Sequence, residues 1–237
     1  TLDQVASGWK RFLCGLGKKV LLANTMGEMA DAVWRVVEQG NDVPVGMAWI
    51  GLACYTLQIY YDFSGYSDMA IGLGRLLGFE FLENFRHPYA SRSVREFWRR
   101  WHISLSTWFR DYVYIPLGGN RISPARTGLN CLLVFGLCGL WHGASVVFIL
   151  WGLWHGLFLM LERGRPDPGA RPGGRAGVAA LGGHLYTLAV VLVGWVLFRS
   201  PTLDIAARYF RCLAGVGEPG REARVLWLDL SPKGGLA

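Results

Sequence analysis

Charged residues are scarce in this chain: only 17% of it is Asp, Glu, Lys or Arg, while 52% is hydrophobic and 14% aromatic. Soluble domains usually contain about a quarter charged residues, so the composition is too apolar for that class. The four charged types are absent from residues 43–61, 127–161 and 176–198. Because roughly 20 apolar residues cross a bilayer, we predict an all-α integral membrane protein.

Cysteine is sparse as well, and its spacing excludes two kinds of site. The five cysteines form no CxxC pair, and most lie in apolar runs, so we interpret them as small hydrophobic residues. No two histidines have the spacing of zinc ligands, and Asp62 and Asp68 lack the repeated spacing of a calcium loop. We therefore predict neither disulfides nor a metal site.

The chain also lacks an initiator methionine and a signal-peptide pattern, since it opens at Thr1 and closes on the polar, glycine-rich residues 231–237. We expect a fragment of a longer protein, with membrane spans missing on both sides. Residues 164–177 are rich in proline, glycine and arginine and are predicted to link the second and third apolar stretches.

The middle apolar stretch, residues 127–161, is too long for one crossing. At about 1.5 Å per residue it would reach about 52 Å, through a hydrocarbon layer of about 30 Å. Basic residues flank both ends, among them Arg126 and Arg163, so both ends should be cytoplasmic. The stretch must then cross an even number of times, and we expect its turn between Gly139 and Gly143.

His142 lies in this expected turn, roughly 22 Å of helix away from Arg126 and therefore deep in the bilayer. The simplest interpretation is a buried histidine that bonds to a neighbour. A non-helical point in the membrane is tolerated only against protein or a water-filled cavity, however, and an ionisable residue there is a functional hypothesis by default. Histidine also moves a proton near neutral pH, which suits deprotonation of a hydroxyl.

Arginine is concentrated between Arg86 and Arg126, where eight arginines accompany only Glu96 and Asp111. Nucleic-acid binding is an alternative explanation of such a patch. A basic segment between apolar spans is better explained by the positive-inside bias, so we predict a cytoplasmic loop and no nucleic-acid partner.

A helix is predicted from Ser93, where Glu96 completes a capping box, through about Arg110. One side would be aromatic and the other cationic, as in a helix at the membrane interface. The first stripe contains Trp98, Trp101, Leu105 and Trp108, and the second contains Arg95, Arg99, His102 and Ser106.

Two further helices are expected before this one. Residues 1–34 form an amphipathic, interfacial pattern. Residues 69–79 resume helical spacing after a polar interruption, with Asp62 or Ser64 as the predicted cap.

Three other histidines compete with His142 as chemical candidates. His102 lies on the predicted cationic stripe, where it is either a second functional residue or a solvated, headgroup-facing side chain. His155 lies among aromatic residues and is predicted to pack in the core, and His87 precedes a proline in a loop.

Long strings of this chain resemble the membrane-bound O-acyltransferase family, in particular its bacterial alginate O-acetyltransferase-like branch. The strings are QIYYDFSGYSDMAIGLGRLLGF, NFRHPYASRSVREFWRRWHISLSTWFRDYVYIPLGGNR and GLWHGASVVFILWGLWHG, which together cover residues 58–156. The resemblance implies a partial acyltransferase domain over residues 1–237, with its catalytic core at 58–156. It also implies a multi-helix bundle in which interfacial helices surround a tunnel.

The resemblance assigns roles to particular residues. The histidine of the family's WHG motif, regarded as the catalytic base, matches His142, and that of the RRWHISLSTW motif matches His102. The residues expected to line the tunnel and contact substrate are Trp98, Arg99, Trp101, Asp111 and Trp141.

The implied reaction is transfer of acetyl from a cytosolic thioester, acetyl-CoA, toward hydroxyls of an exported, alginate-like polysaccharide, with no bound cofactor. The implied setting is a multi-pass protein of the bacterial inner membrane, with the lipid bilayer, the donor and exported acyltransferases of a polysaccharide-modifying system as partners. Two alternatives stay open: transfer of D-alanyl or another acyl group, and a non-catalytic transport or assembly subunit.

Overall fold

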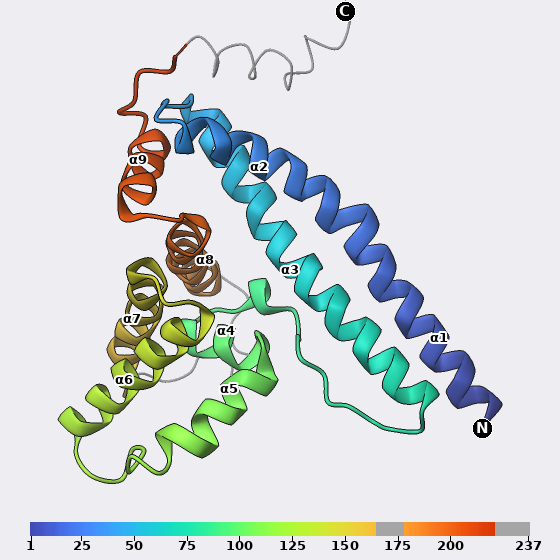
Figure 1. Ribbon diagram of the computed structural model, residues 1–237. Coiled ribbons are helices and arrows are strands. Elements are labelled where there is room, and N and C mark those ends of the chain that lie inside the picture. The colour runs from blue at the N-terminus through green and yellow to red at the C-terminus, as the bar shows by residue number, and fades with distance from the viewer. Residues whose placement is uncertain (165–177, 221–237) are drawn as a thin grey trace, which may run out of the picture. The chain divides into compact units, whose positions relative to one another are not determined.

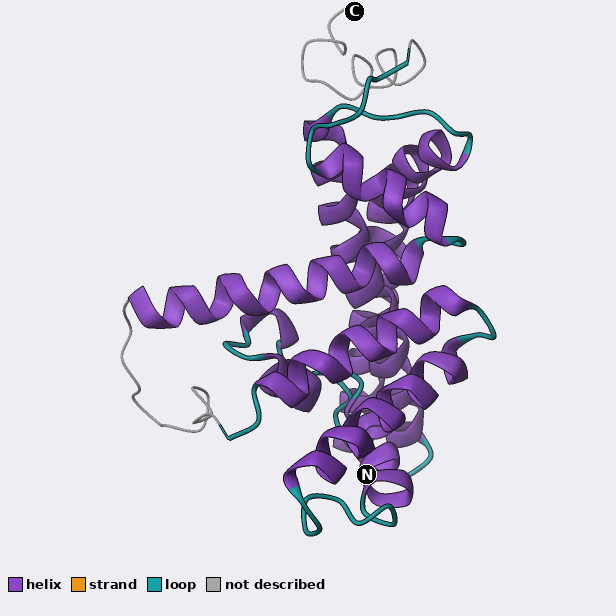
Figure 2. Cartoon of the chain, turned by 90° about the vertical axis from the view of Figure 1, so that its left-hand side faces the viewer, coloured by secondary structure: helices purple, strands orange, loops and turns teal. Residues whose placement is uncertain are grey.

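The computed structural model describes residues 1–164 and 178–220, and these residues are helical apart from loops and one isolated bridge between Asp42 and Pro219 (Figures 1 and 2). The predicted all-α class is confirmed. The predicted linker at 164–177 and the tail at 231–237 lie outside the described residues, except for Gly164.

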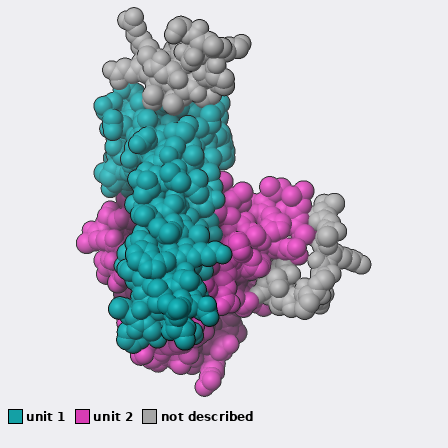
Figure 3. Space-filling view, turned by 90° about the vertical axis from the view of Figure 1, so that its right-hand side faces the viewer, with its two compact units in different colours: residues 1–80, 199–237 teal, residues 81–198 magenta. Residues whose placement is uncertain are grey.

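The chain divides into two compact units, coloured separately in Figure 3. Unit 1 comprises residues 1–80 together with the chain from Arg199 onward, and unit 2 comprises residues 81–198. Unit 1 contains α1 (Leu2–Gly17), a π-helical turn (Lys18–Ala23), α2 (Asn24–Glu38), α3 (Val45–Leu76) and α9 (Leu203–Leu213). Unit 2 contains a 3-10 turn (Pro88–Ala90), α4 (Val94–Arg100), α5 (Ile103–Phe109), a π-helical turn (Arg110–Tyr114), α6 (Pro124–His142), α7 (Val146–Leu161) and α8 (Val178–Arg199, whose last residue belongs to unit 1).

Glycines allow α1 and α3 to pack backbone against backbone, side by side along their length (Figure 1). A Cβ on Gly15 would lie 2.5 Å from the Gly65 carbonyl oxygen, and one on Gly72 would lie 2.7 Å from the Gly8 oxygen. No larger residue fits at these positions without moving the helices apart.

Cations of α1 and of the π-helical turn after it face α3, which overturns one prediction. Asp68 pairs with Arg11 at 2.6 Å and with Lys18 at 2.7 Å, and Asp62 pairs with Lys19. Asp62 and Ser64 therefore lie inside α3, and neither caps a later helix. The polar interruption does not end the helix because α1 and the π-helical turn supply cations to its carboxylates.

α1 has an exposed apolar side, so its predicted amphipathic character is present in the structure. α1 and the π-helical turn that follows it present a row of exposed large hydrophobic side chains. These are Leu2, Val5, Trp9, Leu13 and Leu16 of α1 and Val20 of the turn.

Among the described residues, one helix is long and apolar enough to cross a membrane by length and composition, the segment Ala180–Arg199 of α8. α7 is a shorter apolar helix of the same character. The predicted stretch 43–61 is the N-terminal part of the long α3.

The overlong apolar stretch 127–161 turns back on itself, as predicted. α6 ends at His142 and α7 begins at Val146, and the two helices pack so closely that a Cβ on Gly152 would lie 2.0 Å from the Phe135 oxygen. The open ends of the hairpin meet, since the Arg163 guanidinium donates to the Pro124 carbonyl at 2.5 Å. The two ends of the stretch therefore lie close together.

The single helix predicted from Ser93 to Arg110 is wrong. The cap itself is confirmed, because Ser93 Oγ accepts from the Glu96 amide at 3.0 Å. The helix then breaks at Trp101 and His102, which separate α4 from α5. The break divides the predicted aromatic stripe, so that Trp101 is buried while Trp108 is 51% exposed.

Candidate active site

His142 is the last residue of α6, at the closed end of the α6–α7 hairpin. The backbone becomes extended at Gly143, and Ser145 then caps α7 by accepting from the Val147 amide at 3.4 Å. The His142 ring is half-buried. Its centroid lies 4.9 Å from that of Trp141, and 5.1 Å from those of Trp151 and Phe198.

His102 occupies the break between α4 and α5 and is half-buried. Its φ of 44° is in the left-handed region, which side chains other than glycine and asparagine rarely adopt. Asn84 bonds to the start of α5: its carbonyl accepts from the Ile103 amide at 3.0 Å, and its side-chain oxygen lies 3.3 Å from His102 Nδ1. His102 is thus held by a tertiary contact with Asn84.

Trp141 lies beside both histidines. Its indole meets the His142 ring edge-on at 4.9 Å and the His102 ring at 6.4 Å. Burial, with a smaller effect of the neighbouring His142, lowers the pKa of His102 to about 4, so His102 is neutral near pH 7.

A cavity of about 580 Å³ runs beside α6 in the same unit. Its lining includes the three arginines Arg95, Arg99 and Arg110, and an apolar wall from Trp98, Val134, Phe135 and Cys138. Cys138 is one helical turn before His142, about 6 Å along the axis. The cavity lining therefore approaches His142 to within one helical turn, but it includes neither His142, His102 nor Trp141.

His155 is confirmed as a core residue, with no exposed surface. Its ring lies 5.1 Å from Trp98 and 5.4 Å from Trp151. A Cβ on Gly194 of α8 would lie 2.6 Å from His155 Nε2, so this glycine is required for α8 to approach α7.

The structure places the remaining predicted site residues at different positions. Trp98 and Arg99 line the cavity, and Trp101 packs into the aromatic core 5.0 Å from Trp195. Asp111 does not join them: its side chain pairs with Arg110 at 2.7 Å, and that hydrogen bond lowers the pKa of Asp111. Asp111 is therefore a partner of a cavity arginine and not part of the wall.

The backbone around the site is anchored by polar residues that sequence reasoning did not single out. The Glu162 carboxylate accepts from the first two amides of α4, Val94 at 2.7 Å and Arg95 at 2.9 Å. No motif predicts this contact, since Glu162 is separated from α4 by more than sixty positions.

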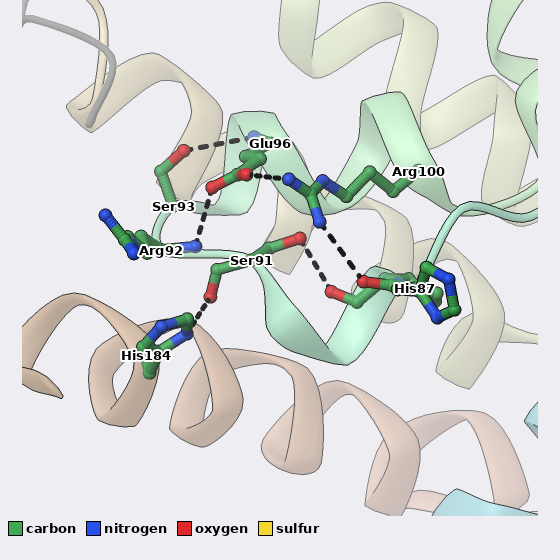
Figure 4. A network of polar contacts seen from close by, with 8 residues as sticks. His87, Ser91, Arg92, Ser93, Glu96, Arg100 and His184 are labelled. Carbon is green, nitrogen blue, oxygen red and sulfur yellow. Dashed lines mark hydrogen bonds and ion pairs between the residues drawn. The ribbon is translucent and has the colours of Figure 1, made fainter. Parts of the chain in front are cut away.

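A second anchoring network surrounds the start of α4 (Figure 4). Glu96 accepts from the Arg92 amide at 2.8 Å and from Arg100 at 2.5 Å. His184 of α8 donates from Nδ1 to the Ser91 carbonyl at 3.0 Å. These contacts fix α4, and with it Trp98 and Arg99, against α8.

All five cysteines are free, as predicted. In residues 1–164 and 178–220 no group of three or more His, Cys, Asp or Glu side chains could hold a metal ion.

Comparison with known proteins identifies relatives of this sequence. It is 48% identical to a probable alginate O-acetylase AlgI of Azotobacter vinelandii, over 92% of this chain and 42% of the relative. It is 36% identical to a peptidoglycan O-acetyltransferase of Helicobacter pylori, over 90% of this chain and 39% of the relative. A teichoic acid D-alanyltransferase of Bacillus subtilis is 37% identical over 38% of this chain and 25% of the relative.

The chain spans about two fifths of the length of the alginate and peptidoglycan relatives. The model of the membrane-bound O-acyltransferase family matches residues 3–165, which include His102, His142 and the cavity wall from α4 to α7. The chain therefore belongs to the membrane-bound O-acyltransferase family.

Proposed function

We propose that this chain carries the reaction centre of an enzyme that transfers acetyl from a cytosolic thioester toward hydroxyls of an exported, alginate-like polysaccharide. The observation that carries the proposal is the pair of histidines beside Trp141, at the end of a hairpin whose neighbouring cavity is cationic on one side and apolar on the other.

In the proposed reaction His142 is the general base. Its imidazole takes the proton of the acceptor hydroxyl while the hydroxyl oxygen forms a bond to the thioester carbonyl carbon. The carbon–sulfur bond then breaks, and the leaving thiolate receives the proton from the imidazolium. His102, as a neutral base nearby, assists by accepting a hydrogen bond from a reacting group.

Acetyl-CoA is the proposed donor. Its phosphates would be attracted by the arginines of the cavity, while the apolar wall suits its pantetheine arm and acetyl group. An acidic carrier protein would be attracted by the same arginines, so the charge pattern is compatible with D-alanyl transfer, the activity in the name of the Bacillus subtilis relative.

The proposed setting follows from the charges and the relatives. The arginine-rich loop faces the cytoplasm of a bacterial inner membrane, which the protein crosses several times. Exported acyltransferase partners would then carry the acetyl group to the polymer, as the names of the alginate and peptidoglycan relatives suggest for a polysaccharide-modifying system.

The test is the acetyl content of the exported polymer in cells that carry His142→Ala. We expect acetylation to be lost while membrane insertion, measured on a tagged protein, is unchanged. The matched control is His87→Asn, because His87 is an exposed histidine outside the cavity. Undiminished acetylation with His142→Ala would refute the proposal.

A second assay separates the alternatives. Purified protein should turn over labelled acetyl-CoA, whereas a transport or assembly subunit should show no turnover. Competition by a D-alanyl carrier thioester would reassign the donor.

A further inference from the structure

We infer that Asn84 is a positioning residue for His102, which fixes the ring so that Nδ1 carries the proton and Nε2 is the basic nitrogen. The functional part of this inference depends on the proposed function, since it assumes that His102 assists acyl transfer. The geometric part, which is the tautomer of His102, depends only on hydrogen bonds.

Asn84 makes several of the hydrogen bonds at the α4–α5 break. Its side-chain oxygen accepts from the Ser104 amide at 3.1 Å and from Ser104 Oγ at 3.0 Å, and it lies 3.3 Å from His102 Nδ1. Its backbone carbonyl accepts from the Ile103 amide at 3.0 Å. One residue thus contacts all three positions from His102 to Ser104.

The Ser104 amide determines which way the Asn84 side chain faces. Oxygen and nitrogen of an asparagine side chain are similar in shape, so their assignment follows from the partners. A backbone N–H can only donate, and the atom 3.1 Å from it must therefore be the acceptor Oδ1.

This orientation determines the tautomer of His102. An amide oxygen only accepts, so a hydrogen bond between it and Nδ1 requires a proton on Nδ1. Ser104 Oγ, 3.4 Å from Nδ1, already donates to the same oxygen and can accept from the ring. In the neutral imidazole the lone pair is then on Nε2.

The tautomer matters because His102 is neutral near pH 7. Burial lowers its pKa, and His142 is the titratable group whose charge acts on it. A neutral ring with the opposite tautomer would present an N–H where the proposed reaction needs a base.

The left-handed backbone of His102 shows that surrounding contacts hold this segment. A residue other than glycine persists at positive φ only where its surroundings determine the conformation. Here the bonds from Asn84 to Ile103 and Ser104 hold the segment in that conformation.

Nitrogen-15 NMR of the full protein in detergent, with labelled histidine, tests the geometry without an activity assay. His102→Asn identifies the resonances of His102, because asparagine tolerates the left-handed backbone. We expect a protonated Nδ1 and an unprotonated Nε2 in the wild type, and a mixture of tautomers in Asn84→Ala. A protonated Nε2 in the wild type, or an unchanged tautomer in Asn84→Ala, would overturn the assignment.

The pH dependence of acetyl transfer tests the functional part. Asn84→Asp keeps an acceptor oxygen beside Nδ1 but adds a negative charge, which favours the protonated ring. We expect the acid limb of kcat/KM to move at least one pH unit higher, and Asn84→Ala to lower kcat about tenfold or more with little change in KM. The charge-matched control is Ser123→Asp, which keeps the cap of α6 about 28 Å along the helix from His142 and should leave the profile unchanged.

The outcomes separate the two claims. An unmoved acid limb in Asn84→Asp, with wild-type turnover intact, would show that Asn84 is only structural. Absence of turnover in the wild-type protein would refute the proposed function and leave the NMR result to decide the geometry.

Discussion

Replacing Gly152 with alanine should separate the α6–α7 hairpin and displace His142. Gly152 is buried, and an added Cβ would lie 2.0 Å from the Phe135 carbonyl oxygen on the opposite helix. Ordinary contact begins at 3.4 Å, so the backbones must move apart by about 1.4 Å. The neighbouring Trp151, whose ring contacts His142, would move with them.

The expected magnitudes follow from this displacement. Overpacking costs about 1–3 kcal/mol, and the better helix propensity of alanine returns about 1 kcal/mol, so the net loss of stability is about 0–2 kcal/mol. Activity should suffer more, because a misplacement of about 1 Å lowers the rate of a positioned reaction about a hundredfold.

Gly136→Ala is the matched control in the same hairpin. Its Cβ would meet Leu153 at an ordinary 3.6 Å, so this variant should be as stable as the wild type or more stable, and fully active. Thermal unfolding in detergent and acetyl transfer from labelled acetyl-CoA are measured on both variants. Equal activity of Gly152→Ala and Gly136→Ala would refute the close-packing argument.

Three further predictions concern single residues outside the hairpin contact. Glu162→Gln should destabilise the protein by about 1.5–3 kcal/mol in thermal unfolding, because charged acceptors at the α4 amides are lost, and an unchanged midpoint would contradict the anchoring role. Asp68→Asn should lower the free energy of unfolding, measured by chemical denaturation, by about 1–3 kcal/mol, because two cations lose a carboxylate that is 9% exposed. An unchanged free energy of unfolding would mean that water replaces these ion pairs. His102→Asn should fold as well as His87→Asn, because both histidines have positive φ, which asparagine tolerates. Only His102→Asn should lose acetyl transfer, and equal activities of the two variants would show that His102 takes no part in the reaction.

The α6–α7 hairpin could be predicted from the sequence because it follows from the length of the apolar stretch. An apolar stretch longer than the membrane must turn, and glycines indicate where. The basic flanks predicted that both ends are cytoplasmic, and the bond from Arg163 to Pro124 places the two ends close together. This prediction depended on one comparison, between the length of the stretch and the thickness of the membrane.

The geometry around His102 could not be predicted in this way. Helical periodicity continues from Ser93 to Arg110, and nothing local indicates the break, since the left-handed turn depends on Asn84 some eighteen positions earlier. The prediction that Asp62 or Ser64 caps a helix failed for the same reason. A polar cluster resembles a helix cap, and the sequence does not show that cations of α1 and of the π-helical turn pair with its carboxylates. Long-range polar contacts leave no periodic signal in a single sequence.

The role of His142 is tested by the single-turnover rate of acetyl transfer from labelled acetyl-CoA to an acceptor hydroxyl, measured on the full-length protein and on His142→Gln. Glutamine fills similar space but cannot take up a proton at neutral pH, so donor binding should persist while the transfer rate falls by about a hundredfold to ten-thousandfold. A variant that binds the donor and transfers acetyl at a rate within threefold of the wild type would contradict the assignment of His142 as the base.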